Sequence, residues 1–363
     1  MLRLRNRRAR IVLAVAILLL LGVAAYFIGV SVWANGQHQA ALQALEHYDF
    51  EKAGQHLEKY LSVRPQDPEI LLLAAQTARR RGEFTEAVRQ VRAAEEAGAA
   101  TDAIATERQL LRIQTADLTD ASRLVQYCTD HAAEAQTALV YEALIEGSLK
   151  AVNPALAQWA VDLWLKHRTG KVDQAQGLVL RGRVHEFLQD MPQALADFRK
   201  ALELVPEHLP ARLRLAEVLI REAPAEAAPQ VEWLQRHRPQ DPEVRFLGAR
   251  LHRNLGRPEE ASRLLDAILA TTPDKIPVLL ERARVAMELH RPQDAERWLL
   301  RALSLAPMQR EVNLALSDCL RQAGRLAEAR RYQDRLAEID ANLKKRLDEL
   351  TRKAKTAGGP PGG

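Results

Sequence analysis

The chain has 363 residues, of which 47% are hydrophobic, 27% are charged and only 5% are aromatic. This composition is typical of a folded protein rich in helices, and it excludes a largely disordered chain. Lysine and arginine number 52 against 47 acids, but five of the arginines stand within the first ten residues. Because the remaining charges balance, the basic pI does not indicate nucleic-acid binding. Two cysteines are too few for a disulfide framework or a zinc finger.

A membrane-spanning helix is the first predicted element. Residues 11–33 carry no charge, and as a helix they extend over about 34 Å, enough to cross a hydrocarbon core of about 30 Å. The basic stub at residues 1–10 predicts a cytoplasmic N-terminus and an extracytoplasmic remainder, which would be periplasmic if the protein is bacterial. A signal peptide cleaved before Asn35 is the alternative. Ala25 and Gly29 form a small-xxx-small pair that favours, more weakly, the pairing of two anchors.

A repeat occupies most of the remaining chain. An alanine recurs at intervals of 33 to 37 residues, with a glycine five residues before it in three units and a proline twelve residues after it in five. The glycine can adopt a positive φ and end one helix, the alanine lets the next helix approach closely, and the proline ends that helix. Each unit is therefore predicted to be a helix–turn–helix pair that stacks on its neighbours. The positions are Ala53, Ala87, Ala121, Ala157, Ala194, Ala227, Ala261, Ala295 and Ala329; Gly82, Gly256 and Gly324; and Pro65, Pro206, Pro239, Pro273 and Pro307.

A longer identity supports this period. The segment Arg-Pro-Gln-Asp-Pro-Glu at residues 64–69 recurs without change at residues 238–243, at the same phase of the repeat. In both copies we expect the aspartate, Asp67 or Asp241, to cap the next helix. The following proline should occupy the first turn of that helix, and the glutamate should complement its dipole.

These features resemble the tetratricopeptide repeat (TPR) family. The resemblance covers about residues 37–340 as nine units, of which the third and fourth, residues 103–170, lack the glycine and the proline and are expected to be degenerate helix pairs. It implies an all-α fold, a right-handed superhelical solenoid of helix–turn–helix TPR units preceded by one transmembrane helix. In the fifth unit, the positions of the family signature are held by Gly182, Ala194, Phe198, Ala201 and Pro206.

The array is expected to divide into two subarrays, at residues 37–170 and 171–340. The ninth unit has no proline to end its second helix, so this helix should continue through residues 341–356. This continued helix would serve either as a cap on the array or as a docking or coiled-coil helix for a partner. The glycine- and proline-rich tail, residues 357–363, is expected to be flexible. The apolar stripe of the long helix consists of Leu336, Ile339, Leu343, Leu347 and Leu350.

No motif for catalysis, for a cofactor or for a metal is found in the sequence. There is no glycine-rich phosphate loop, no His-Glu-x-x-His and no Gly-x-Ser-x-Gly. His38, His47 and His56 are nine residues apart, which turns a helix by half a revolution, so they share no face. We therefore predict that the chain is not an enzyme and holds no cofactor or metal. An enzyme would need a constellation in the degenerate units, around Glu134, Tyr141 and Glu142.

The cysteines and tryptophans are better explained by packing. Cys128 and Cys319 are expected to be small buried thiols rather than reactive ones. Four tryptophans fall in predicted second helices, where they should pack between repeats: Trp159, Trp164, Trp233 and Trp298.

Arginines recur in the first helices of the units, which in the TPR family line the concave face where peptides or partner helices bind. Such a row would attract an acidic segment or a C-terminal carboxylate through paired hydrogen bonds. The alternative is a solvated face on which Glu186 and Asp318 neutralise the row. The candidate groove residues are Arg183, Arg250 and Arg284 at the ninth position of the unit, and Arg79, Arg253 and Arg321 at the twelfth.

The sequence therefore predicts a membrane-anchored, non-enzymatic TPR scaffold. Its partners would be proteins or peptides, with acidic segments among them, and the membrane through residues 11–33, but not nucleic acid. The scaffold would assemble or tether a complex at the extracytoplasmic membrane face. The alternative is a regulatory or substrate-presenting subunit of a membrane-associated enzyme complex, such as envelope polysaccharide or protease machinery. The sequence predicts no oligomeric state.

Overall fold

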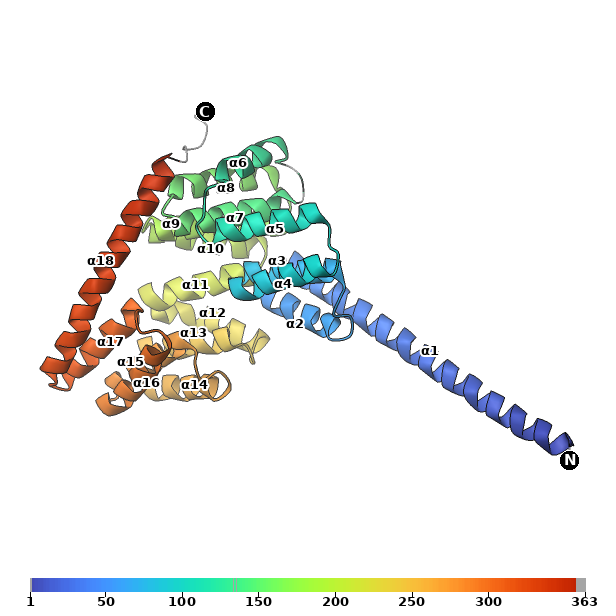
Figure 1. Cartoon of the computed structure of the whole chain (residues 1–363). Coiled ribbons are helices and arrows are strands. Elements are labelled where there is room, and N and C mark those ends of the chain that lie inside the picture. The colour runs from blue at the N-terminus through green and yellow to red at the C-terminus, as the bar shows by residue number, and fades with distance from the viewer. Residues whose placement is uncertain (1, 133, 135, 357–363) are drawn as a thin grey trace. The chain divides into compact units, whose positions relative to one another are not determined.

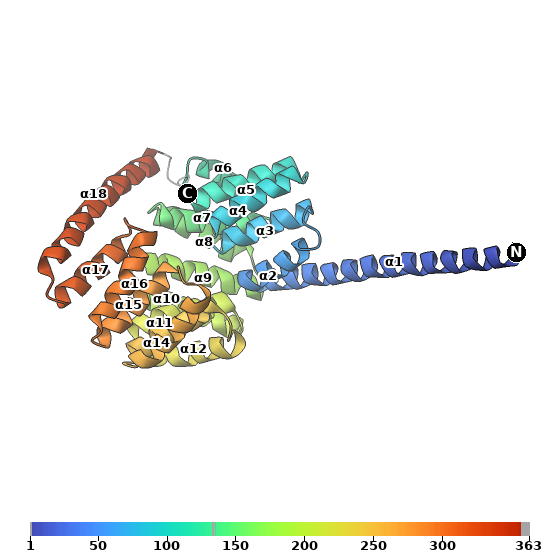
Figure 2. The ribbon, with the colours of Figure 1, turned by 60° about the horizontal axis from the view of Figure 1, so that its bottom comes forward.

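The computed structural model describes residues 2–132, 134 and 136–356, and these residues form helices and no strand. The chain divides into two compact units, Met1–Thr115 and Ala116–Gly363. Within each unit, consecutive helices pack side by side along the chain (Figure 1 and Figure 2). The prediction of an all-α solenoid built from paired helices is confirmed.

The first unit contains five helices. They are α1 (Leu2–Glu46), α2 (Phe50–Leu61), α3 (Pro68–Arg80), α4 (Phe84–Glu96) and α5 (Thr101–Gln114).

The second unit contains the other helices of the described chain. They are α6 (Ala121–Asp130), α7 (Thr137–Lys150), α8 (Pro154–His167), α9 (Lys171–Phe187), α10 (Met191–Leu204), α11 (Leu209–Glu222), α12 (Pro224–His237), α13 (Pro242–Asn254), α14 (Pro258–Thr271), α15 (Ile276–Glu288), α16 (Pro292–Leu305), α17 (Arg310–Gln322) and α18 (Leu326–Thr356).

The repeat alanines lie in the buried interfaces between packed helices. All nine are buried, with at most 7% of each residue exposed. A larger side chain at these positions would push the second helix of a pair away from the first, which is why the period is so visible in the sequence. The tryptophans also lie in second helices, and Trp164 is fully buried, with Nε1 donating to the carbonyl oxygen of Asp173 at 2.7 Å.

The turn inside eight of the nine pairs has the same backbone conformation, with a positive φ. The predicted glycines Gly82, Gly256 and Gly324 have φ of 79°, 72° and 77°. In five of the six units without this glycine, the same position, five residues before the repeat alanine, also has a positive φ; in the sixth unit it is Glu222, the last residue of α11. The five residues of positive φ are Tyr48, Ala116, Val152, Gln189 and His290. The turn geometry is therefore set by the hairpin, and glycine only removes its steric cost.

The helix ends follow the predicted caps. Asp67 Oδ1 accepts from the amide of Ile70 at 3.3 Å, and Asp241 Oδ1 accepts from the amide of Glu243 at 2.9 Å. Pro68 and Pro242 occupy the first turns of α3 and α13. Both copies of the repeated hexapeptide therefore start a first helix, as expected.

The long helix α1 joins the apolar N-terminal stretch to the first repeat without a break. The stretch has a mean hydropathy of 2.7, and none of it is buried. The same helix then packs on α2 through Ala34 and Ala41, which are fully buried. Arg64 Nη2 donates to Ser31 Oγ at 2.9 Å, so the loop after α2 also contacts this junction. By length and composition α1 is compatible with a single membrane span or with a signal sequence.

The last helix, α18, continues to Thr356, as predicted from the missing proline. Its first part packs on α17, and Arg310 Nε donates to Asp340 Oδ1 at 2.7 Å where α17 begins. Beyond this contact, residues 341–349 are exposed. The Leu350 side chain and the tail at residues 357–363 lie outside the described residues.

The boundary between the compact units falls between α5 and α6, so the two helices of the third repeat belong to different units. The degenerate third and fourth repeats are helical, as expected: they comprise α5 and α6, and α7 and α8. The division of the array at residues 170 and 171 stays a prediction.

Candidate protein-binding groove

First helices of three successive repeats form a groove in the second unit. The groove has a volume of about 580 Å³, and its walls come from the C-terminal parts of α7, α9 and α11 together with residues of the α9–α10 turn and α10. We call this feature the first-helix groove. Its residues are Glu146, Leu149, Lys150, Arg183, Glu186, Phe187, Gln189, Met191, Arg214, Arg221 and Glu222.

Part of the groove wall is apolar. Leu149 from α7, Phe187 from the end of α9 and Met191 from the start of α10 contribute to it. Phe187 is 36% exposed although it is a large hydrophobic residue. An exposed aromatic side chain in a concave surface is a typical anchor point for a protein ligand, because its area leaves water when the ligand binds.

The charged groups of the groove are arranged in pairs across neighbouring helices. Arg183 on α9 pairs with Glu146 on α7, and Arg221 on α11 pairs with Glu186 on α9 at 3.3 Å. These ion pairs connect the first helices of successive repeats. They also place carboxylates beside the arginines, so the groove is not a simple row of positive charge.

The lining of the groove has more basic than acidic side chains, although Glu217 beside it pairs with Arg214 at 3.0 Å. Four cations line it, Lys150, Arg183, Arg214 and Arg221, against three glutamates. Burial, together with the nearby Arg214 guanidinium, lowers the pKa of Arg183. Burial also lowers the pKa of Lys150. A lowered pKa means that the charged form is less well stabilised here than in water.

Of the six predicted groove arginines, only Arg183 lines this groove. Three others, in later repeats, also pair with carboxylates: Arg253 and Arg284 both pair with Glu281, at 2.6 and 3.0 Å. Arg321 pairs with Asp318 at 2.7 Å, within one helix. Arg250 lies with its guanidinium carbon 6.0 Å from the centroid of the Phe246 ring.

Arg79 does not line a groove, and this expectation is wrong. Its side chain is fully buried between α3 and α5. Nε donates to Glu107 Oε1 at 2.6 Å, and Nη1 donates to Gln114 Oε1 at 2.8 Å. The first helix of the next repeat covers the arginine, so it stabilises the array instead of meeting a ligand.

The repeat register would have identified more of the groove than the arginines did. Glu146 and Arg183 stand eleven residues before their repeat alanines, and Leu149 and Glu186 stand eight residues before them. All four line the groove. Of these four, the sequence indicated Arg183 as a groove residue and Glu186 as a residue that could neutralise it, but Glu146 and Leu149 were not predicted. Phe187 and Met191 flank the α9–α10 turn, and neither stands at one of these two repeat positions.

The described residues show no arrangement for metal chemistry or for a reactive thiol. They contain no group of three histidine, cysteine or acidic side chains that could hold a metal ion. Cys128 and Cys319 are both buried, as expected. Burial raises the pKa of the Cys128 thiol to about 12, which disfavours a nucleophilic thiolate.

Solved structures of repeat proteins are similar to this chain. A TPR protein of Parabacteroides merdae is 15% identical, with 79% of this chain and 99% of that chain covered and a TM-score of 0.45. A thermophilic TPR protein of Thermus thermophilus is 23% identical, with coverage of 49% and 98% and a TM-score of 0.43. PilW, a type IV pilus biogenesis factor, is 19% identical, with coverage of 60% and 100% and a TM-score of 0.48.

Family models identify the repeats directly from the sequence. Two tetratricopeptide repeat models match, one at residues 221–276 and 280–343 and the other at residues 175–208. No curated protein matches the sequence significantly. The matched segments cover most of α9, α10 and the helices from α12 into α18, while α11 falls almost entirely between them. The chain therefore contains tetratricopeptide repeats at residues 175–208, 221–276 and 280–343.

Proposed function

We propose that this TPR protein is a membrane-anchored scaffold that binds partner proteins in the first-helix groove. The observation that carries the proposal is the groove itself, where three first helices supply apolar and charged side chains around about 580 Å³. The repeats are a scaffold for protein interaction, and the groove lies on the helices that such repeats use for it. Catalysis plays no part in the proposal.

The groove favours an amphipathic segment with an acidic group. Leu149, Phe187 and Met191 would contact the apolar side chains of the partner. A partner carboxylate would compensate the positive charge around Arg183, where burial lowers the pKa of the guanidinium. A helix or peptide carrying one acidic residue beside apolar residues meets both requirements.

Membrane anchoring would work through α1. Its apolar stretch would cross the bilayer, and the same helix continues into the first repeat without a flexible linker. The basic residues before the stretch favour a cytoplasmic N-terminus, so the repeats would lie outside the cytoplasm. Confinement at the membrane would raise the effective concentration of the groove for partners in the same membrane.

A binding experiment with matched variants tests the scaffold role. Phe187→Asp places a charge in the apolar wall, and Leu300→Asp places the same charge on α16, where Leu300 is 44% exposed. Each full-length chain would be purified from detergent-solubilised membranes, and its bound proteins would be quantified by mass spectrometry. We expect the main partners to fall at least tenfold with Phe187→Asp and to stay unchanged with Leu300→Asp. Identical partner levels for both variants and the wild type would contradict the groove assignment.

A separate experiment tests the anchor and its orientation. A reporter that is active only outside the cytoplasm would be fused to the C-terminus, and the mass of the membrane-bound chain would be measured. We expect an active reporter and an intact N-terminus. A stable but inactive fusion would contradict the orientation, and a chain beginning at Asn35 would contradict the anchor in favour of a cleaved signal.

A further inference from the structure

The end of α18 extends beyond the helix that supports it. An ion pair between Arg310, where α17 begins, and Asp340 joins the two helices at 2.7 Å. The residues that follow, 341–349, are all exposed. Among them are Leu343 and Leu347, which lie about one helical turn apart and are 49% and 38% exposed. We call these two leucines the distal stripe.

The sequence around the distal stripe is strongly basic. We call residues 341–356 the distal segment; it contains six basic and two acidic residues, an excess of four positive charges. Between the N-terminal stub and this segment, the chain has 41 basic and 45 acidic residues. The excess of positive charge is therefore a local property of the distal segment. Its basic residues are Lys344, Lys345, Arg346, Arg352, Lys353 and Lys355, and its acidic residues are Asp348 and Glu349.

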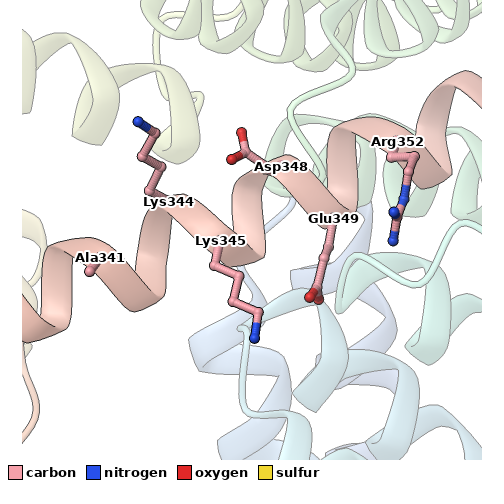
Figure 3. Close-up of a pocket in the computed structure, with 6 residues that line it drawn as sticks. All are labelled: Ala341, Lys344, Lys345, Asp348, Glu349 and Arg352. Carbon is pink, nitrogen blue, oxygen red and sulfur yellow. The ribbon is translucent and has the colours of Figure 1, made fainter.

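These charges are ordered around the helix axis. At 3.6 residues per turn, Lys344 and Arg346 stand about 80° to either side of the middle of the distal stripe. Asp348 and Glu349 stand farther from it, at about 120° and 140°. Figure 3 shows Lys344 and Asp348 projecting to one side of the helix and Glu349 to the other. A cation therefore borders the apolar stripe on both edges, and the two carboxylates lie farther from it.

We propose that the distal segment of α18 lies on the surface of a bilayer that contains anionic phospholipids. Leu343 and Leu347 would enter the boundary between headgroups and acyl chains. Lys344 and Arg346 would cover the edges of the stripe with their aliphatic stems and place their charges at the lipid phosphates. Asp348 and Glu349 would remain on the side that faces water.

Charge complementarity selects this partner. A surface of anionic lipids attracts a segment with four excess positive charges, and it repels a segment with excess negative charge. A second copy of the segment carries the same excess, so the two copies would repel one another. A helix bound in a protein groove usually presents apolar anchors over several turns, whereas the distal stripe covers about one.

The inference does not depend on the first-helix groove. It also does not require α1 to be an anchor, because the distal segment itself would supply the contact with lipid. If α1 does cross the membrane, confinement of the chain would raise the effective concentration of the segment for lipid.

A dye on the distal stripe tests the proposal. Leu347→Cys would carry an environment-sensitive dye in the full-length chain, held in phosphatidylcholine nanodiscs; Cys128 and Cys319 are buried and should not react. Vesicles with a quencher on their acyl chains would then be added. We expect at least a twofold fall in emission with vesicles that contain phosphatidylglycerol and no change with phosphatidylcholine alone. The same dye at Leu300→Cys on α16, where the leucine is 44% exposed, should not be quenched.

Each other result of this experiment contradicts the proposal. Equal quenching by both kinds of vesicle would show that anionic lipid is not recognised. No quenching by either kind would leave a protein as the partner of the segment. A dye that is already shielded from water before vesicles are added would show that a protein surface covers the stripe.

A charge reversal tests the role of the flanking cations. Lys344→Glu/Arg346→Glu removes the excess charge of the segment and keeps both leucines, so the dye-labelled chain should bind anionic vesicles at least tenfold more weakly. The control Lys59→Glu/Lys200→Glu makes the same change in net charge at exposed lysines of α2 and α10, and it should bind as the parent does. Both variants should keep the parent's circular dichroism spectrum. Equal binding by the two variants would overturn the proposal.

Discussion

Arg253 on α13 donates from Nε to Glu281 Oε1 on α15 at 2.6 Å, 28 residues further along the chain. Arg79 makes the same contact with Glu107, also 28 residues along and at 2.6 Å. Each arginine has a second partner 35 residues along, Glu288 for Arg253 and Gln114 for Arg79. One repeat position therefore connects the first helices of neighbouring repeats in both compact units, but only the pair of Arg79 and Glu107 is completely buried.

Removing the buried arginine should destabilise the chain strongly. Arg79→Ala leaves the Glu107 carboxylate buried without its guanidinium, which costs about 3–5 kcal/mol. Arg253→Ala should cost only about 1 kcal/mol, because Glu281 keeps its ion pair with Arg284 at 3.0 Å. Chemical denaturation followed by circular dichroism measures both changes.

The double replacement Arg79→Met/Glu107→Leu is the control for this argument. It removes both charges and retains apolar volume, so it should be much less destabilising than Arg79→Ala alone. If Arg79→Ala and Arg253→Ala lowered the free energy of unfolding equally, burial of the ion pair would not determine how much it stabilises the chain.

The turns between paired helices offer a stabilising substitution. Val152 has φ of 58°, a conformation that costs a β-branched residue about 1–2 kcal/mol, so Val152→Gly should stabilise the chain by about 1 kcal/mol. Gly82→Ala is the reverse change at the same repeat position and should destabilise by about 1 kcal/mol. No atom lies within 4 Å of a Cβ added at Gly82, so the change in stability would come from the backbone conformation alone. Thermal unfolding measures whether each variant gains or loses stability. A loss of stability in Val152→Gly would contradict the strain assigned to its positive φ.

Close packing of α8 on α9 makes Gly177 intolerant of a methyl group. A Cβ there would lie 2.5 Å from Trp164 Cδ1 and 2.6 Å from Leu165 Cδ2. Gly177→Ala should therefore destabilise by about 1–3 kcal/mol although alanine favours helices. Gly36 in α1 is exposed with open space around it, and Gly36→Ala should instead stabilise by about 0.5–1 kcal/mol. The two unfolding midpoints should thus move in opposite directions; movement in the same direction would refute the packing argument.

Cys128 should be inert to alkylation in the native protein. Burial raises the pKa of its thiol from the ordinary value of 9.0 to about 12, so little thiolate forms near pH 9. Because the folded pKa is above the unfolded one, the thiol contributes stability at neutral pH that is lost progressively as the pH rises above about 9. Iodoacetamide labelling at pH 9, with mass spectrometry of the peptides, should modify Cys128 only after denaturation. Rapid labelling of the folded chain would contradict its burial.

The sequence predicted the array well because its signals are steric and local. The buried alanines, the glycines of positive φ and the Asp-Pro caps each act within one helix pair, so the spacing alone revealed them. Val152 and His290 show the limit of this approach, since both adopt the glycine conformation without the glycine signal.

The candidate site was predicted less completely, because it depends on contacts between repeats. Arg79 and Arg253 share one repeat position, yet the first is covered by α5 and the second is partly exposed. The sequence of one repeat does not determine which charged side chains the neighbouring repeat places beside its arginine. The contribution of Phe187 and Met191 arises where the α9–α10 turn meets the groove, which no helical period indicates.

Site-specific photocrosslinking at Phe187 in intact cells tests most directly whether the first-helix groove binds a partner protein. A photoreactive amino acid would replace Phe187 in the groove and, as the matched control, Leu300 on α16. We predict a discrete crosslinked band from Phe187, containing an extracytoplasmic or membrane protein, and no such band from Leu300. Crosslinks of equal yield and pattern from the two positions, or none from Phe187, would contradict the account.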